Sequence, residues 1–451
     1  MNANGIHSPA RISLSRPWLR GRMVTTGSKI FNLSQLKILI VVVCFFRASN
    51  LFGVTHAIHS KPPVESNIAS VSGRDFPTDP FVRRQVRFWE AVFQKYPSNS
   101  VIIHDLVDPL AMIDVINFDH YITNAGNVTS VASSEQTNLV KNYISRYDVA
   151  VERFAKFKEA AVKFGPIEQR LNDVYSKDPA SLTRLYKGDV KFRGQGGLSD
   201  TFILAASRAQ EYMPYMERAF RQYGLPVSLT RLPFVESMFN LQARSKVGAS
   251  GIWQFMPQTA REFMYVGTLV DERNNPYKAT HAAAQLFLEN YRELKSWPLA
   301  ITAYNHGRGG MSKAAKAMGT NQLGNIISNY KSSSFGFASK NFYAEFLAAA
   351  RTYELVTSTG LVKGKIDSPA MDIIALSKPS TLRSLSRTTS LSPEAIAKLN
   401  PCLSTNITTK YLDESLPKSY EIRLPKSAAA LLRRSQPSVR ISKTVSQTIR
   451  R

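Results

Sequence analysis

The chain has 451 residues, of which 43% are hydrophobic and 10% aromatic, enough for two or three domains with ordinary cores. Its formal net charge is +25, and the ends supply much of it: residues 1–60 and 426–451 each hold seven Lys or Arg and no Asp or Glu. A basic protein can attract nucleic acid, anionic lipid or another polyanion. The sequence contains no nucleic-acid motif and no basic helix with interleaved aromatic residues, which argues against a nucleic-acid partner.

The N-terminal region has the layout of a secretory signal peptide. Basic residues as far as Lys37 precede an apolar run, Ile38–Phe46, and a short stretch ending in the small residue Ala57 follows. The run is shorter than the roughly 20 residues that a spanning helix needs. We therefore predict a signal peptide over residues 1–57, with cleavage near Ala57. The alternative is a buried core segment.

Cysteine and histidine give no support for a disulfide framework or a metal site. After cleavage, Cys402 would be the only cysteine, because Cys44 lies in the apolar run, without the small neighbours of a lipidated cysteine. The seven histidines show no ligand spacing such as His-x₃-His. We therefore expect no metal, no cofactor and no intrachain disulfide.

Periodicity divides the next part of the chain. Residues 58–75 are predicted to be a linker rich in Pro, Ser and Gly. Residues 76–197 show helical periodicity around one β-prone piece, Ser100–His104, and are predicted to form a helical domain to which we assign no chemistry. Residues 198–360 are predicted to form a second domain of long helices separated by clear breaks. The predicted fold class is therefore mainly α.

The C-terminal part differs in composition. Residues 370–426 contain β-prone pieces at Met371–Leu376 and Tyr420–Leu424 with two short helical pieces between them, which predicts a small α+β module. Residues 427–451 are basic and without acids, so we expect a disordered tail. Its charges would attract the carboxylates of a polyanion or an anionic membrane surface. A tail without a role is the alternative.

One carboxylate in the second domain is a candidate catalytic group. Glu236 follows an apolar helical face formed by Leu229, Leu232 and Val235, so its carboxyl should be partly desolvated. Burial raises the pKa of a carboxyl because it disfavours the charged form. A Glu that stays protonated can donate a proton to a leaving oxygen. A surface acid at the end of an apolar helix has the same pattern, so this position alone decides nothing.

Two further motifs follow Glu236. From Ser245 to Pro257, glycines and small residues surround Trp253 and Gln254, and Ala303–Gly307 places Tyr and Asn at a glycine break. Glycine lets the backbone approach a ligand closely, and the Gln254 amide can both donate and accept hydrogen bonds. Trp253 offers a flat apolar face to a sugar ring. The alternative is a core tryptophan at a tight turn.

Three motifs, in this order, resemble those of the soluble-lytic-transglycosylase family. They are Glu-Ser at 236–237, Gly-Ala-Ser-Gly-Ile-Trp-Gln-Phe-Met-Pro at 248–257 and Ala-Tyr-Asn-His-Gly at 303–307. The nearest group within it is that of membrane-bound lytic murein transglycosylase D. The resemblance covers residues 212–356 and implies a goose-type lysozyme-like helical fold.

The resemblance also implies roles for individual residues. Glu236 matches the catalytic acid. A late tyrosine of the family corresponds to Phe342 or, with a one-residue shift, to Tyr343, which we predict to bind substrate. The other predicted substrate-binding residues are Ser245, Gln254, Met256, Tyr304 and Asn305.

The implied reaction is the non-hydrolytic cleavage of peptidoglycan strands in the bacterial periplasm, between N-acetylmuramic acid and N-acetylglucosamine. Most glycosidases use two carboxylates, whereas the 248–257 and 303–307 motifs add none to Glu236. A single Glu suits substrate-assisted chemistry that leaves 1,6-anhydro ends. Two alternatives remain: a goose-type muramidase that uses water, and a non-catalytic wall-binding protein.

The C-terminal module has a weaker resemblance of its own. Its order of strand, two helices and strand is similar to a degenerate LysM module, a peptidoglycan-binding unit. The usual Gly-Asp-Thr-Leu opening is replaced by Lys-Pro-Ser-Thr-Leu at 378–382. A packing cap on the catalytic domain is the alternative.

Overall fold

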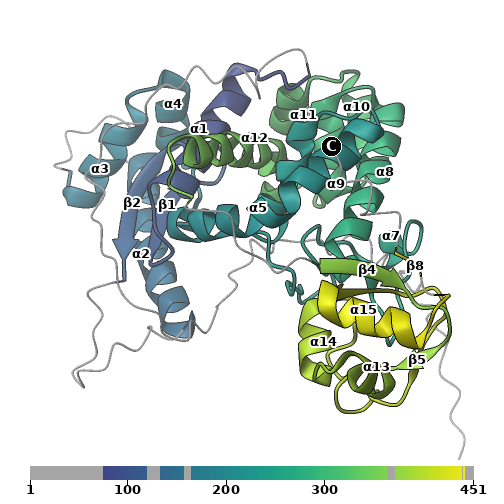
Figure 1. Cartoon of the computed structure of the whole chain (residues 1–451). Coiled ribbons are helices and arrows are strands. Elements are labelled where there is room, and N and C mark those ends of the chain that lie inside the picture. Colours follow the sequence, from purple (N-terminus) through teal and green to yellow (C-terminus); the bar gives the residue numbers. More distant parts are fainter. Residues whose placement is uncertain (1–74, 119–132, 157–163, 363–370, 439, 442–451) are drawn as a thin grey trace, which may run out of the picture. The chain divides into compact units, whose positions relative to one another are not determined.

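The computed structural model describes residues 75–118, 133–156, 164–362, 371–438 and 440–441 (Figure 1). The predicted signal peptide at 1–57 and the last part of the basic tail lie outside the described residues. Of the predicted linker, only Asp75 is described. Within the described ranges, no helix combines the length and the apolar character needed to span a membrane.

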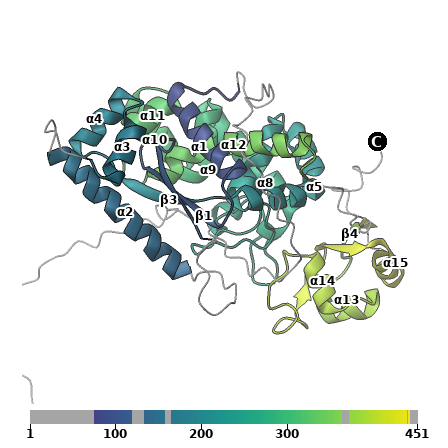
Figure 2. The same ribbon diagram turned by 90° about the vertical axis from the view of Figure 1, so that its left-hand side faces the viewer.

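The N-terminal region is not purely helical, so the prediction of a helical domain over 76–197 is wrong in part. Three antiparallel strands form a sheet in the order β2-β1-β3, visible in Figures 1 and 2. The predicted β-prone piece is β1. The other two strands lacked a clear signal, because β2 alternates weakly and β3 (Phe-Arg-Gly-Gln-Gly) is poor in β-formers. The elements are α1 (Pro80–Gln94), β1 (Ser100–Asp105), β2 (Met112–Asn117), α2 (Ser133–Lys156), α3 (Pro166–Tyr175), α4 (Pro179–Lys187) and β3 (Phe192–Gly196).

This sheet contributes to two cores. Neighbouring residues of a strand point to opposite faces: Ile103 belongs to a core with α2, α3 and α4, whereas Ile102 belongs to the large core of the following domain. Helix α1 also packs in that large core, through Phe88, Trp89 and Phe93. The packing boundary therefore does not fall at residue 197.

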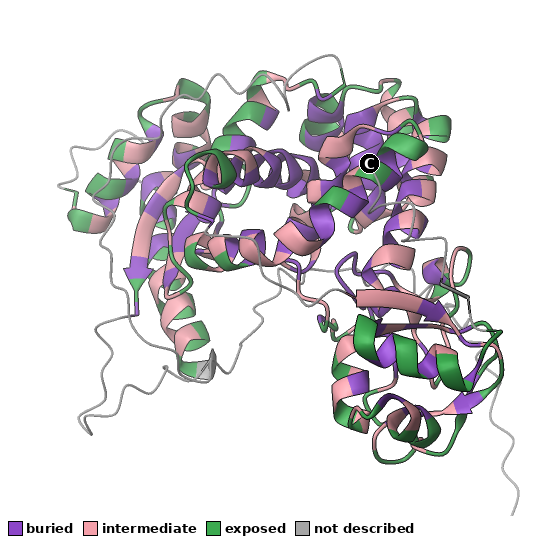
Figure 3. Ribbon diagram, in the orientation of Figure 1, coloured by how far each residue is buried: buried purple, intermediate pink, exposed green. Residues whose placement is uncertain are grey.

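The second domain is helical, as predicted. It consists of α5 (Ser199–Gln222), η2 (Val227–Arg231), α6 (Leu232–Glu236), α7 (Pro257–Ala260), η3 (Glu272–Asn274), α8 (Pro276–Leu294), α9 (Trp297–His306), α10 (Arg308–Met318), α11 (Leu323–Asn329) and α12 (Phe337–Ser358). Helix α12 is buried along most of its length (Figure 3). Its many alanines let α1, α6 and α9 approach closely, so α12 is the central helix on which the candidate site is built.

The C-terminal module has the predicted strand–helix–helix–strand order. Strand β4 pairs antiparallel with β7, with Ile374 opposite Ile422, and β8 lies on the other side of β4. Glycan binding by this module stays a prediction. Its elements are β4 (Met371–Ala375), β5 (Ser380–Thr381), α13 (Leu382–Thr389), α14 (Pro393–Leu399), β6 (Ser415–Leu416), β7 (Glu421–Pro425), α15 (Lys426–Ser435) and β8 (Arg440–Ile441).

The prediction of a disordered tail from residue 427 is wrong for its first part. Helix α15 buries Ala428, Ala429 and Leu432 against the module, and Arg433 forms an ion pair with Asp372 at 2.9 Å. Ala and Leu are strong helix formers, and here they recur at helical spacing. The predicted disorder rested on charge alone and ignored this periodicity.

The module is hydrogen-bonded to a segment of the second domain. The backbone N–H of Asp271 donates to the Cys402 carbonyl at 2.7 Å, and that of Ser404 donates to the Leu269 carbonyl at 2.9 Å. Between them, Val270 is buried in the core of the module. These contacts fit the alternative that the module is a packing cap.

Candidate active site

Glu236 is the last residue of the short helix α6 and is partly exposed. The chain turns sharply after it, because Met238 and Phe239 both have a positive φ, at 50° and 54°. Such left-handed conformations are unfavourable for residues with a Cβ, and they concentrate at functional sites. The turn is held by the Arg208 guanidinium, which donates to the Met238 carbonyl at 2.7 Å, and by the fully buried ring of Phe239. The fold therefore fixes the position of the Glu236 backbone.

Ser237 connects this turn to the glycine-rich motif. Its buried hydroxyl donates to the carbonyl of Ile252 at 2.8 Å. Ser237 therefore ties the turn that follows Glu236 to the 245–256 loop.

The 245–256 loop is folded tightly on itself. The Ser245 hydroxyl accepts from the Ala249 N–H at 2.8 Å, with Gly248 at φ +92° between them. Gly251 has φ +77°, and a Cβ added there would lie 1.9 Å from the Arg273 carbonyl oxygen. Only glycine fits at position 251, because the backbone of residue 273 passes directly against it.

Arg273 binds the backbone of this loop through its guanidinium group. Its guanidinium donates to the carbonyls of Gly248 at 2.6 Å and Phe255 at 3.0 Å, and it is paired with both carboxylate oxygens of Asp271. Arg273 is almost completely buried. A buried, fully bonded guanidinium rigidifies the backbone it binds, so the loop is preorganised.

Gln254 is buried with φ +48°, and its amide is fixed. The side-chain NH₂ donates to the carbonyls of Ala243 at 3.1 Å and Gly251 at 2.8 Å. Turning the amide over would place an oxygen against two carbonyl oxygens. A ligand at Gln254 would therefore meet Oε1, an acceptor, so the prediction that this amide both donates to and accepts from a ligand is wrong.

Trp253 is a core residue, as the alternative reading held. Its side chain is fully buried, stacks on Phe220 with ring centroids 5.7 Å apart, and donates from Nε1 to the Thr280 hydroxyl. The predicted sugar-stacking face is thus covered by protein.

The 303–307 motif ends helix α9 close to Glu236. The buried Tyr304 hydroxyl donates to the Trp253 carbonyl at 2.8 Å, and the pKa of Tyr304 is raised by burial and by the Glu236 charge. Tyr304 therefore stays neutral and ties α9 to the loop. Asn305 is partly exposed, and its Oδ1 accepts from the Ser339 hydroxyl at 2.9 Å, which fixes it to α12. Met256 is partly exposed at the start of α7.

The part of the chain that contains Glu236, the 245–256 loop and the 303–307 motif is similar to known proteins. Residues 214–327 match the family described as Transglycosylase SLT domain. This part of the chain is thus similar to the SLT domain. The resemblance to lytic transglycosylases is confirmed, and the match includes all three motifs.

Two known proteins are similar in sequence to about a quarter of this chain. The chain is 32% identical over 111 residues to the membrane-bound lytic murein transglycosylase D of Escherichia coli (strain K12), which covers 24% of this chain and 25% of the relative. It is 31% identical over 113 residues to the "Putative tributyltin chloride resistance protein" of Alteromonas sp. (strain M-1), covering 25% of this chain and 55% of that protein. The chain thus matches between a quarter and about half of the length of these relatives.

Tyr343 lies outside the matched SLT region, and the structure does not bring it to the site. Its buried hydroxyl donates to the carbonyl of Pro77 at 3.1 Å, next to the start of α1. The one-residue shift that favoured Tyr343 turns the side chain by about 100° around the helix. Phe342, the ungapped match, lies three residues before Glu345 and thus on the same face of α12 as that acid.

Glu345 is a titratable group near the site that the sequence analysis missed. It is 9% exposed on α12, and its pKa is raised to about 8, first by burial and then by the negative charge of Glu236, while Arg193 opposes the shift. Arg193 comes from β3, in the region to which we assigned no chemistry. A usable signal was present: Glu345 is the one acid in the otherwise apolar stretch 342–350.

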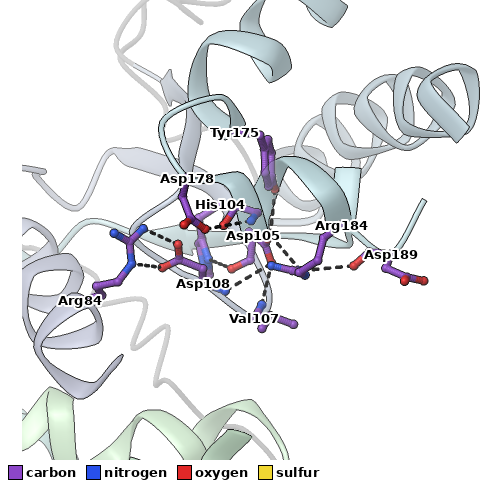
Figure 4. Close-up of polar contacts among 10 residues, drawn as sticks. Arg84, His104, Asp105, Val107, Asp108, Tyr175, Asp178, Arg184 and Asp189 are labelled. Carbon is purple, nitrogen blue, oxygen red and sulfur yellow. Dashed lines mark hydrogen bonds and ion pairs between the residues drawn. The ribbon is translucent and has the colours of Figure 1, made fainter. Parts of the chain in front are cut away.

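The N-terminal region contains a second polar cluster, around Asp105 (Figure 4). This fully buried carboxylate accepts from the Tyr175 hydroxyl at 2.8 Å, from Arg184 at 3.1 Å and from the Val107 N–H at 2.7 Å. The pKa of Tyr175 is raised by burial and by the Asp105 charge. Because its acceptors are saturated by the protein, this cluster is a structural joint between β1, α3 and α4 rather than a ligand site.

Proposed function

We propose that this chain is a peptidoglycan lytic transglycosylase in which Glu236 acts first as acid and then as base. The observation that carries the proposal is the position of Glu236: at the end of α6, in an SLT match, joined through Ser237 to the preorganised 245–256 loop. The printed name of the Escherichia coli relative supports the same reaction class.

In the first step, Glu236 protonates the oxygen between N-acetylmuramic acid and N-acetylglucosamine. The bond from this oxygen to C1 breaks, the N-acetylglucosamine part leaves with the proton, and the substrate's own N-acetyl oxygen stabilises the positive charge at C1. The acid must hold its proton until this point, for which a partly buried carboxyl is suited.

In the second step, the ionised Glu236 takes the proton of the C6 hydroxyl. O6 bonds to C1 and closes a 1,6-anhydro ring, so no water is consumed and Glu236 regains its proton. One group serves in both directions. Ser245, Gln254 Oε1, Met256 and Asn305 are proposed to line the sugar site.

A goose-type muramidase is the second candidate, and Glu345 is the observation that favours it. Hydrolysing glycosidases pair two carboxyls, and Glu345 lies within the electrostatic reach of Glu236. However, burial raises the pKa of Glu345 to about 8, so near neutral pH it would not serve as a base that activates water.

Location and partners are proposed with the function. The substrate requires an envelope protein, and the signal peptide predicted over residues 1–57 would export it to the periplasm. Peptidoglycan strands are the proposed partner. No metal is proposed to take part; among the described residues, no group of three or more His, Cys, Asp or Glu is placed to hold an ion.

The test is mass spectrometry of the fragments released from purified sacculi. We expect 1,6-anhydromuramic ends that form equally well with a chelator present. Reducing muramic ends would favour the muramidase.

Glu236→Gln should lower this activity by at least about a hundredfold, since general acid–base catalysis contributes roughly 10²–10⁴-fold. Glu293→Gln is the matched control, because it removes an exposed carboxylate of α8 whose ion pair with Arg308 is worth little. A smaller loss in Glu236→Gln than in the control would remove Glu236 from the reaction.

A further inference from the structure

Segment 269–271 of the second domain pairs with the C-terminal module in the manner of a short strand. The two backbone hydrogen bonds described above, at 2.7 and 2.9 Å, flank an antiparallel bridge between Val270 and Leu403. Val270 is only 3% exposed, and it belongs to the core of the module and not to the large core of its own domain. The module therefore holds both the backbone and an apolar side chain of this segment.

Two ion pairs add to this contact. Arg423 of β7 is paired with Glu211 of α5 at 2.6 Å, and both side chains are partly buried. Lys278 of α8 lies 3.8 Å from Glu421, which is also on β7. Partly buried pairs are screened by salt less than exposed pairs. The module is thus bound to helices α5 and α8 as well as to segment 269–271.

The Asp271 side chain connects the held segment to a buried arginine. Its carboxylate accepts from Arg273 Nε at 2.9 Å and from Nη2 at 2.7 Å. Such two-point pairing fixes the plane of the guanidinium as well as its position. Because the backbone N–H of Asp271 is bonded to the module, the module fixes the point from which Arg273 is oriented.

Arg273 in turn binds the loop that carries the predicted substrate-binding residues. Its Nη1 donates to the carbonyls of Gly248 at 2.6 Å and Phe255 at 3.0 Å, which lie toward the two ends of this loop. The next residue, Asn274, accepts a hydrogen bond from the buried Ser250 hydroxyl at 2.7 Å. A continuous series of hydrogen bonds therefore leads from the module to the loop.

We propose that the C-terminal module is part of the structure that positions the substrate, because it holds segment 269–271 and through it the 245–256 loop. Asp271 and Arg273 are positioning residues, and Val270 anchors their segment in the module. This inference rests on the proposed function, which assigns substrate binding to the loop. A wall-binding module that acted independently would change only the affinity for sacculi. A module that positions the loop also affects the turnover of a short soluble glycan.

The first test is hydrogen–deuterium exchange of the full chain, read by mass spectrometry of its peptides. Val270→Asp places a carboxylate in the apolar core of the module, which is unfavourable enough to release segment 269–271. Exchange in the 245–256 loop should then be about tenfold faster or more, because losing buried hydrogen bonds destabilises local structure by that order. Peptides from the central helix α12 should exchange as in the wild type.

Thr268→Asp is the matched control, because it adds the same charge two residues away at an exposed position. Exchange in the loop should stay at the wild-type rate in this variant. An unchanged loop in Val270→Asp would overturn the proposal. An equal rise of exchange in α12 would overturn it too, because Val270 would then stabilise the whole fold and not the loop in particular.

The second test compares two carboxylates that each form a two-point pair with an arginine. Asp413 pairs with Arg383 at 2.7 and 3.0 Å, as Asp271 pairs with Arg273, but on the exposed surface of the module. In Asp271→Asn, kcat/KM on a short soluble glycan should fall by about 10- to 100-fold, since a displacement of about 1 Å can cost a hundredfold. Asp413→Asn should leave it unchanged. A loss in Asp271→Asn that is confined to the binding of sacculi would contradict a positioning role.

The exchange measurement needs no turnover, so the two proposals can fail separately. If Val270→Asp loosens the loop but the wild-type chain does not cleave sacculi, the proposed function fails and the link between module and loop stands. If sacculi are cleaved to 1,6-anhydro ends but exchange in the loop is independent of Val270, the link fails and the function stands.

Discussion

The matched SLT region, residues 214–327, and the elements outside it contribute to the candidate site in different ways. The matched region supplies Glu236 and its loop through short motifs that are hydrogen-bonded to one another within that region, as Ser237 is to Ile252. The outer elements supply Glu345 and Arg193, from α12 and β3, which come near the site only through packing. The candidate acid thus comes from the part that sequence motifs identify, whereas the second buried carboxyl comes from an element that only packing brings near it.

The largest effect is expected inside the matched region, from Gly251→Ala. The added Cβ would lie 1.9 Å from the Arg273 carbonyl oxygen, so the loop must move. We expect roughly 3 kcal/mol or more of lost stability and loss of sacculus cleavage, measured by chemical denaturation and product release.

Gly224→Ala is the matched control. Gly224 has a similar φ of +67° but open space around it, so only the conformational penalty of about 1 kcal/mol should appear. Equal effects of the two changes would show that the contact with Arg273 is unimportant.

An intermediate effect, on the pH dependence of the free energy of unfolding, is expected outside the matched region. The folded pKa of Glu345 is raised from 4.5 to about 8. A raised carboxyl pKa means that the associated stability is fully present below about pH 4.5 and is lost as pH rises to about 8, by at most about 1.4 kcal/mol per pH unit. Glu345→Gln should flatten this dependence in denaturation curves recorded between these pH values. A wild-type dependence identical to that of the variant would mean that Glu345 is not buried as described.

The smallest effect is expected where the two regions meet. A Cβ at Gly324 of α11 would lie 1.8 Å from the carboxylate of Asp79, which caps α1 by accepting from the Val82 N–H. Gly324→Ala should displace this cap, with a loss of about 1 kcal/mol, as for other helix N-caps. Asp79→Ala should lose a similar amount, and the double variant should lose no more than either alone. Full additivity would mean that the two positions are independent.

The sequence predicted the features that depend on neighbouring residues. The helical second domain, the strand at 100–104 and the order of elements in the C-terminal module all follow from local periodicity and appear in the structure. It left matters open where packing decides. For Trp253 the sequence allowed either a sugar platform or a core residue, and only Phe220, far away in sequence, decides for the core.

The remaining errors have the same cause. Strand β3 forms because β1 pairs with it, not because its own residues favour strands. The choice between Phe342 and Tyr343 depended on which neighbour each meets, and Pro77 is the neighbour of Tyr343. Glu345 was visible as an acid in an apolar helix, but its relation to Glu236 and Arg193 exists only in the folded chain.

The fixed amide of Gln254 makes this position selective for the direction of a hydrogen bond. Both hydrogens of its amide are donated to the carbonyls of Ala243 and Gly251. The side chain can therefore only accept a hydrogen bond from a ligand, through Oε1, and the ligand group must be a donor. A sugar hydroxyl or an acetamido N–H meets that condition, whereas an ether oxygen would face Oε1 with two sets of lone pairs opposed. Leaving such polar atoms unpaired costs about 1–3 kcal/mol. Gln254 would thus distinguish a free hydroxyl from one that carries a substituent, independently of the size of that substituent.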